Sequence, residues 1–144
     1  MEVTYIPNQT VAGGQNALFN TSVPCPKGYV IHENGSGLVT LRGIVNNACG
    51  TFARYRCVAI TNAAISAGET VAPISIALSK NGETILSSVA ILTPQATEAY
   101  NHICLVADVN VPRGCCAQLT LKNISADGTS VDLQNSKLDV FRVA

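Results

Sequence analysis

Thiols and imidazoles are the side chains of this 144-residue chain with the most potential for metal binding or covalent chemistry. Zinc sites are built from such groups at characteristic spacings, of which C-x-x-C is the clearest. No C-x-x-C pair occurs, and neither His32 nor His102 stands at the spacing of a zinc-ligand set. The sequence therefore predicts no metal centre and no cofactor. The six cysteines are Cys25, Cys49, Cys57, Cys104, Cys115 and Cys116.

Two of these cysteines are adjacent and open a segment that alternates apolar with polar residues. Cys115 is in phase with Ala117 and Leu119, which predicts that it faces the core, whereas Cys116 is in phase with Gln118 and should face outward. Because successive residues of a strand point to opposite faces, the two thiols cannot readily chelate one ion or form a relaxed disulfide. Both are expected to remain free thiols that pack as small apolar side chains.

Catalytic groups do not converge in the sequence. A nucleophilic Cys25 or Cys49 with His32 as its base is the sharpest option, but no third orienting group or oxyanion motif accompanies it. The carboxylates are scattered beside turns. Asp127 and Asp132 have a spacing that would allow calcium contact, and an ordinary Asp-Gly turn explains the same stretch. We therefore expect a protein that is not an enzyme.

Composition narrows the class of protein further. The chain is 47% hydrophobic and 12% charged, which is typical of one folded domain. It has 9 basic and 9 acidic residues, so no net charge favours nucleic acid or a membrane surface as a partner. Its apolar runs are too short to span a bilayer, and the start MEVTYIPNQT lacks the pattern of a signal peptide. We expect assembly in a cytoplasm, with apolar surface covered by other protein.

Short alternating segments separated by Gly, Pro, Asn and Ser make up most of the chain. Residues 72–80 (APISIALSK) meet Asn81-Gly82, the strongest hairpin signal, and residues 83–92 resume the alternation. The stretch 93–100 is interpreted as a loop. Eight or nine such strands predict an all-β, antiparallel two-sheet jelly-roll sandwich. Further strands are expected at residues 16–23, 28–33, 37–43, 52–60, 100–111, 116–124 and 136–144.

Two strands carry apolar residues on both faces. In HICLVADV, Ile103 and Leu105 share one face while Cys104 and Val106 occupy the other. The closing segment KLDVFRVA behaves similarly. One face of each strand is buried by its own sandwich, so the other needs a cover, and subunit association would supply it.

The order of these segments resembles a known family. A mid-chain Asn-Gly hairpin (ISIALSKNGETI), a late strand entered through a Gly turn (DVNVPRGCCAQLTL) and the closing strand SKLDVFRVA look like the trimeric jelly roll of tumour necrosis factor and the complement heads. The resemblance covers roughly residues 14–144. It extends to bacterial and phage members on spore coats, fibres and phage heads, and most of all to small prophage-encoded proteins of gut Firmicutes.

The resemblance implies a homotrimer. Apolar residues on the second faces of the two strands are then expected at the trimer interface. Arg54 and Arg56 lie in phase on one strand, and the family topology implies that Arg142 lies on a neighbouring strand. These arginines are expected to pair with Asp108 or Asp139 across the subunit boundary, or else to form a solvated rim. The predicted interface residues are Cys104, Val106, Phe141, Val143, Arg54 and Arg56. With only 3 Phe, 4 Tyr and no Trp, the chain lacks the aromatic core of the animal members, so cytokine-like signalling is not expected.

These expectations together predict a structural role for the protein. Residues 1–13 are interpreted as an extended amino-terminal anchor, and residues 14–144 as the jelly-roll domain. The anchor would dock through Val3, Tyr5, Ile6 and Pro7 on the major capsid protein or another virion protein. We expect a trimeric decoration or cement protein on the capsid surface of a bacteriophage.

A second function remains open. The same jelly roll would also suit the receptor- or glycan-binding head of a phage fibre, or of a bacterial or spore surface appendage, with a host-surface glycan as ligand. Such heads usually offer aromatic side chains to stack on sugars. The loops of this chain contain mainly Gly, Asn, Ser and Thr, which favours decoration.

Overall fold

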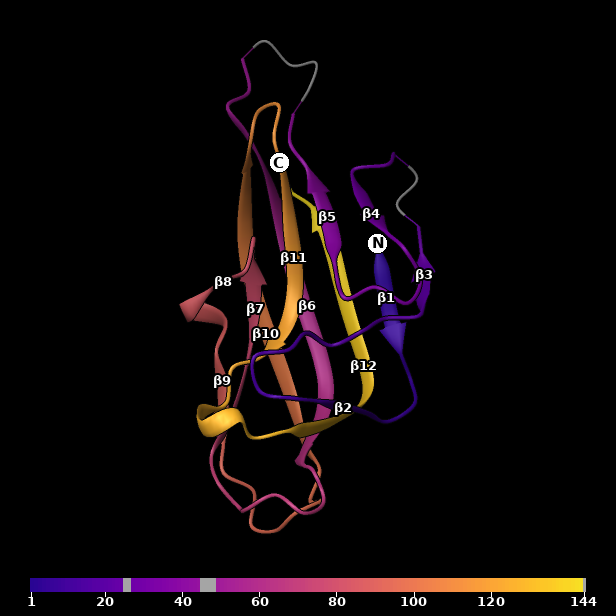
Figure 1. Ribbon diagram of the computed structural model, residues 1–144. Coiled ribbons are helices and arrows are strands. Elements are labelled where there is room, and N and C mark those ends of the chain that lie inside the picture. Colours follow the sequence, from indigo (N-terminus) through magenta and orange to yellow (C-terminus); the bar gives the residue numbers. More distant parts are fainter. Residues whose placement is uncertain (25–26, 45–48, 144) are drawn as a thin grey trace.

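The fold is a sandwich of two antiparallel sheets (Figure 1). The computed structural model describes residues 1–24, 27–44 and 49–143. Sheet A has the strand order β10-β6-β12-β1-β3, with β2 also paired to β12. Its strands are β1 (Glu2–Tyr5), β2 (Gln9–Val11), β3 (Thr21–Val23), β6 (Phe52–Ile65), β10 (Asn101–Pro112) and β12 (Val131–Arg142).

Sheet B forms the second layer. Its order is β4-β5-β11-β7-β8, with β9 also paired to β7. The strands are β4 (Val30–His32), β5 (Val39–Arg42), β7 (Ile74–Lys80), β8 (Glu83–Thr84), β9 (Ala90–Leu92) and β11 (Cys116–Asn123). The helices of the described residues are two short turns, η1 (Leu86–Ser88) and η2 (Ala126–Gly128), so no helix there is long enough to cross a membrane. The all-β, two-sheet antiparallel prediction is confirmed.

The core lies between the two sheets because each long strand sends alternate residues inward. In β10, Ile103, Leu105, Ala107 and Val109 are buried, as the sequence predicts. Tyr55 of β6 is fully buried as well, and its hydroxyl lies 3.2 Å from the carbonyl oxygen of Tyr29. That contact spares a buried hydroxyl the cost of lying unpaired in the core.

The Asn-Gly hairpin is confirmed, but the segment after it differs from the prediction. Asn81 and Gly82 have φ values of 52° and 85°, the left-handed pair that a tight hairpin turn requires. The expected strand over residues 83–92 is instead β8, the turn η1 and β9. The Ser88 hydroxyl donates to the Ile85 carbonyl at 2.7 Å and accepts from the Leu78 amide at 3.0 Å. The Ser88 hydroxyl therefore accepts a backbone hydrogen bond from β7 that a paired strand would otherwise accept.

The amino-terminal segment is part of sheet A, which corrects the expectation of a separate anchor over residues 1–13. Strand β1 lies between β12 and β3, with Val3 opposite Leu138. Strand β2 pairs with the first residues of β12. Val3 is 0% exposed. The alternation of the segment therefore serves the core of the sandwich, and the jelly roll includes these residues.

Candidate functional site

The outer face of sheet A, the side that points away from sheet B, carries the predicted interface residues. Strand alternation places Arg54 and Arg56 of β6 on this face together with Cys104 and Val106 of β10. Phe141 of β12 lies opposite Arg56, so it belongs to the same face. Val143 follows β12 in phase with Phe141, and its amide donates to the Arg54 carbonyl at 2.9 Å. The six residues are therefore brought together on one surface.

The middle of this face is apolar. Val106 stands opposite Val58, and Cys104 stands opposite Ile60, so four apolar side chains form a block on β10 and β6. Val106 is 50% exposed, although it is flanked by strand neighbours. We call these four residues the apolar block. Exposing an apolar surface of this kind to water is unfavourable, so covering it with a partner lowers the free energy.

A second apolar group lies toward the carboxyl end of β12. Phe141 and Val143 are 47% and 49% exposed, and Phe52 at the start of β6 is 40% exposed. The Arg54 guanidinium carbon lies 5.6 Å from the centre of the Phe52 ring, within the range of a cation–π contact. Apolar and basic groups therefore alternate across this part of the face.

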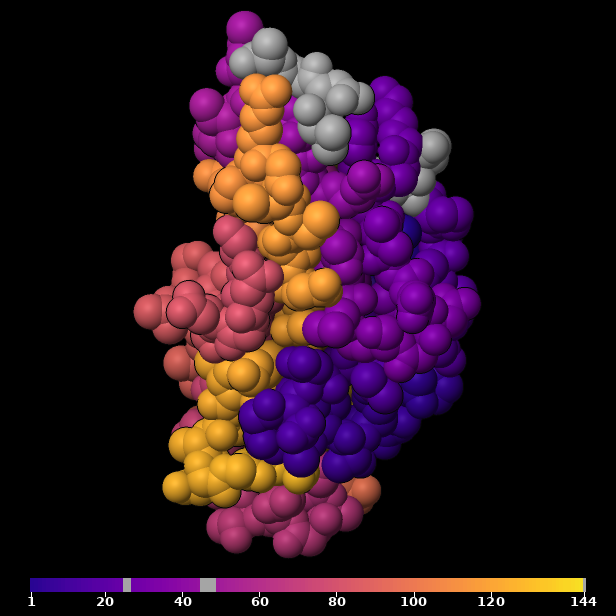
Figure 2. Space-filling model, turned by 45° about the horizontal axis from the view of Figure 1, so that its top comes forward, coloured from indigo at the N-terminus to yellow at the C-terminus, as the bar shows by residue number. Residues whose placement is uncertain are grey.

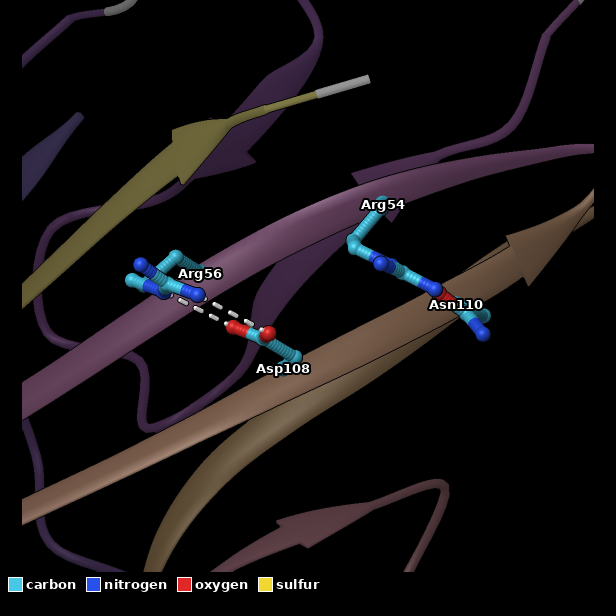
Figure 3. A network of polar contacts seen from close by, with 4 residues as sticks. All are labelled: Arg54, Arg56, Asp108 and Asn110. Atoms are coloured by element: carbon cyan, nitrogen blue, oxygen red, sulfur yellow. Dashed lines mark hydrogen bonds and ion pairs between the residues drawn. The ribbon is translucent and has the colours of Figure 1, made fainter.

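The arginines are held by polar partners on β10 (Figure 3). Arg56 donates from Nε to Asp108 Oδ1 at 2.9 Å and from Nη2 to Oδ2 at 3.1 Å, a bidentate pair. Arg54 donates from Nε to Asn110 Oδ1 at 3.2 Å. The hydrogen bond from Arg56 lowers the pKa of Asp108, and the same carboxylate raises the pKa of Arg56. Both guanidinium groups are thus held against side chains of β10.

Acidic groups lie on the other side of the apolar block. Lys137 of β12 contacts Asp139 at 3.2 Å and Glu2 at 3.5 Å. The hydrogen bond that Lys137 donates to Asp139, followed by the charges of Asp139 and Glu2, raises the pKa of Lys137. Two carboxylates against one ammonium leave this corner acidic, while Arg54, nearer the start of β6, leaves a second corner basic. The face therefore carries both signs of charge around an apolar middle.

The structure changes the expected role of the basic side chains. Arg56 pairs with Asp108 within one chain rather than across a boundary, because β6 and β10 are hydrogen-bonded neighbours. Arg142 lies on β12, which is a neighbour of β6 as expected. It points to the opposite side of β12 from Phe141, and its guanidinium carbon lies 4.3 Å from the centre of the Tyr29 ring. Adjacent strand residues face opposite ways, which explains this placement.

The four predicted docking residues differ in their exposure to solvent. Val3 is buried and Tyr5 packs partly buried against the core. Ile6, which is 59% exposed, and Pro7 lie at the surface in the turn after β1. Strand geometry explains the division, because a segment paired on both sides keeps one set of side chains inside. Of the four predicted docking residues, Ile6 and Pro7 are the exposed ones.

The cysteines differ in their exposure to solvent. Cys116 is exposed, as predicted, but Cys115 is exposed too, and its predicted burial is wrong. Strand β11 begins at Cys116, so Cys115 belongs to the preceding turn, where its amide donates to the Pro112 carbonyl at 3.1 Å. Cys57 is buried in the core, and this burial raises the pKa of its thiol to about 12. Within the described residues no three His, Cys, Asp or Glu side chains form a group suited to a metal. Cys25 lies outside the described residues.

His32 has a partner that sequence spacing did not identify. Its Nδ1 lies 2.6 Å from the hydroxyl of Ser22, and its Nε2 lies 2.9 Å from the carbonyl oxygen of Ser36. Because a carbonyl only accepts, Nε2 donates to the Ser36 carbonyl. Strands β3 and β4 are edge strands of different sheets. The contact ties the two edges together, and only the folded topology brings them close.

Comparisons with known proteins identify the fold. No protein-family model and no curated protein matches the chain. Among solved structures, Eiger TNF from S. frugiperda is similar with a TM-score of 0.60 and 15% identity, covering 100% of this chain and 92% of that one. The sandwich is thus a TNF-like jelly roll.

Two further structures are similar at a lower level. The sugar-binding C-terminal domain of EclA has a TM-score of 0.37 and 19% identity, covering 81% of this chain and 87% of that one. The CBM22-1 xylan-binding domain of Paenibacillus barcinonensis Xyn10C has a TM-score of 0.41 and 13% identity, covering 100% of this chain and 95% of that one.

Proposed function

We propose that this protein is a non-enzymatic structural protein that associates as a homotrimer through the outer face of sheet A and decorates a bacteriophage capsid. The observation that carries the proposal is the composition of that face. The half-exposed Val106 and Phe141 lie within one surface that also carries a bidentate ion pair and an acidic corner. An apolar centre with charged surroundings is the usual anatomy of a protein interface.

A second copy of the chain is the partner that this surface suits. The basic corner at Arg54 lies beyond one end of the apolar block along β6, and the acidic corner at Glu2 and Asp139 lies beside the block on β1 and β12. A face with both signs can place its basic corner against the acidic corner of a copy, and a rotation that closes after three copies makes a ring. A partner of a single charge sign would leave one corner opposed by like charge.

Light scattering coupled to size exclusion tests the assembly. The expected mass is three times the 15.0 kDa chain mass at micromolar concentration. A monomer under these conditions would contradict the trimer.

The capsid location has its own support and its own test. It is supported by the resemblance to small prophage-encoded jelly rolls and by the exposed turn at Ile6 and Pro7, which lies outside the apolar block. The purified protein should co-sediment with capsids that lack it, and Ile6→Asp should reduce that binding while leaving the trimer mass unchanged. Detection of the protein on a cell or spore surface, with none in purified virions, would overturn the capsid proposal.

A further inference from the structure

The outer face of sheet B contains a hollow of about 180 Å³ beside the β4–β5 hairpin. Figure 2 shows this side of the molecule, where the purple β4–β5 region lies against the orange β11. Strand β5 pairs with β11, so Thr40 and Gln118 are opposite each other and form the floor. The lining residues are Ile31, Glu33, Ser36, Leu38, Thr40 and Gln118.

The polar lining groups have hydrogen-bonding capacity left for a ligand. Gln118 accepts from the Thr40 hydroxyl at 3.1 Å through Oε1, which leaves its amide hydrogens to donate. Ser36 Oγ accepts from the Leu38 amide at 3.0 Å, which leaves its hydroxyl hydrogen. Glu33 is exposed and its carboxylate forms no ion pair with any residue that the structure describes. Hydrogen-bond donors and a charged acceptor therefore face the same small space.

The wall that carries Glu33 and Ser36 is fixed by the fold. The Ser36 amide donates to the Glu33 carbonyl at 3.0 Å, which closes the turn. The Ser36 carbonyl accepts from Phe19 at 3.2 Å and from His32 Nε2 at 2.9 Å. The His32 ring is itself held by Ser22 at 2.6 Å. The position of the polar wall is thus set before any ligand arrives, which lowers the entropy cost of binding.

Gly37 adds a steric reason for this geometry. A Cβ at this position would lie 2.5 Å from the carbonyl oxygen of Ala17, so the hairpin packs against the segment that follows β2 without room for a side chain. This close packing presses the hairpin onto the body of the sandwich. The hollow is therefore bounded by rigid backbone on the β4–β5 side.

The remaining lining is apolar. Ile31 and Leu38 are 47% and 46% exposed, and both border the polar groups. Aliphatic side chains of this kind cover the C–H face of a ring, while neighbouring amides and carboxylates bind its hydroxyl groups. None of the six lining residues is cationic. A negatively charged ligand would meet the Glu33 carboxylate without a compensating charge.

We propose that this hollow binds one neutral sugar ring. Glu33 accepts hydrogen bonds from two neighbouring hydroxyl groups, the Gln118 amide donates to a third oxygen, and Ile31 with Leu38 covers the C–H face. The volume lies below the roughly 300 Å³ at which pockets for drug-sized ligands begin, which restricts the ligand to a single ring or the end residue of a glycan. The site lies on sheet B, so a trimer formed through sheet A leaves it open.

The test uses the full chain and neutral methyl hexopyranosides, followed by two-dimensional NMR of backbone amides. Without aromatic stacking the dissociation constant should be about 1–10 mM. Shifts are expected at Glu33, Ser36 and Gln118. Methyl glucuronide should bind at least tenfold more weakly. The proposal is overturned if no neutral hexopyranoside shifts these amides, or if the glucuronide binds as well as its neutral counterpart.

Matched variants separate the site from the fold. Glu33→Gln should weaken binding about tenfold, because a charged acceptor is replaced by a neutral one. Glu98→Gln changes the same charge at an exposed position on the β9–β10 loop and should bind like the parent. Leu38→Ser should also weaken binding. Because it changes a different lining residue, it tests the site independently if the Glu33 variant fails to fold. Equal affinity in all three would contradict the assignment.

Two further measurements settle the source of the sugar and the independence of the site. A panel of neutral oligosaccharides, compared with the methyl glycosides, distinguishes a glycan end from a free monosaccharide, since a glycan should bind more tightly through its terminal ring. The mass in solution is measured on the same samples. A trimer that binds no sugar would remove this inference alone, whereas a monomer that binds sugar would remove only the proposed assembly.

Discussion

Arg56 and Asp108 face each other across β6 and β10 and form two hydrogen bonds, of 2.9 and 3.1 Å. Both belong to one chain and both are about half exposed, so the pair exists without any partner subunit. Isolated pairs in this setting add little to stability. The effect of this pair is geometric, because it holds the Arg56 guanidinium beside the apolar block, on the face of the proposed interface.

The first prediction concerns the proton affinity of Asp108. Arg56 lowers its pKa from the ordinary value of 3.8, so the ion pair is present at neutral pH and is lost as the pH falls through the lowered pKa. Arg56→Ala should raise the pKa of Asp108 toward 3.8 and leave the unfolding temperature almost unchanged. Carboxyl carbon NMR titration measures this. An unchanged pKa would show that the pair does not form in solution.

The second prediction concerns the apolar residues of the same face. Val106→Asp and Phe141→Asp should each weaken association by about 30-fold or more, because each places a charge on an apolar part of the proposed interface. Both side chains are half exposed in the single chain, so the variants should still fold. Ile91→Asp, at a 70% exposed position on β9, is the control and should assemble like the parent. Light scattering that shows intact trimers for both variants would exclude this face as the interface.

The third prediction uses the cysteines as reporters. Cys57 should resist a thiol reagent in the native protein, since burial raises the pKa of its thiol to about 12 and blocks access. Cys115 and Cys116 are exposed in the turn before β11 and at its start, and should react quickly. Cys104 lies in the apolar block, so it should react in the Phe141→Asp variant and be protected in the trimer. Mass spectrometry of labelled peptides distinguishes these sites.

Cys104 also provides an internal check on the assembly. Rapid labelling of Cys104 in the parent protein at micromolar concentration would show that the face is open. Full denaturation should expose all six thiols. Labelling of fewer than six would indicate that some cysteines are oxidised, contrary to the sequence prediction.

Features set by local alternation could be predicted from the sequence. The inward set of β10 and the Asn81-Gly82 turn depend on neighbouring residues only, and both are confirmed. Cys115 shows the limit of this method. Its phase matches the core set of β11, but the strand starts one residue later, and the turn sends the side chain outward. A difference of one residue in the start of β11 therefore decides whether Cys115 is buried.

Features set by the pairing of distant strands could not be predicted. The contact between Ser22 and His32 joins edge strands of different sheets, and no spacing in the sequence marks it. The same holds for the hollow on sheet B, whose floor depends on the register between Thr40 and Gln118. The amino-terminal segment was misinterpreted for a related reason, because an alternating strand looks the same whether it pairs within its own chain or with a neighbour.

The last prediction tests that amino-terminal strand. Val3→Ala should destabilise the protein by about 2 kcal/mol, because a fully buried side chain between β12 and β3 leaves a cavity when shortened. Ile6→Ala, three residues later at an exposed position, should change stability by less than about 0.5 kcal/mol. Urea denaturation of both variants gives the two values. Similar small losses for both would mean that β1 detaches from the sheet in solution, which would restore the separate anchor over residues 1–13. A large loss confined to Val3 would instead show that the strand is part of the fold, so that the segment could contact a capsid only through its exposed residues, among them Ile6 and Pro7.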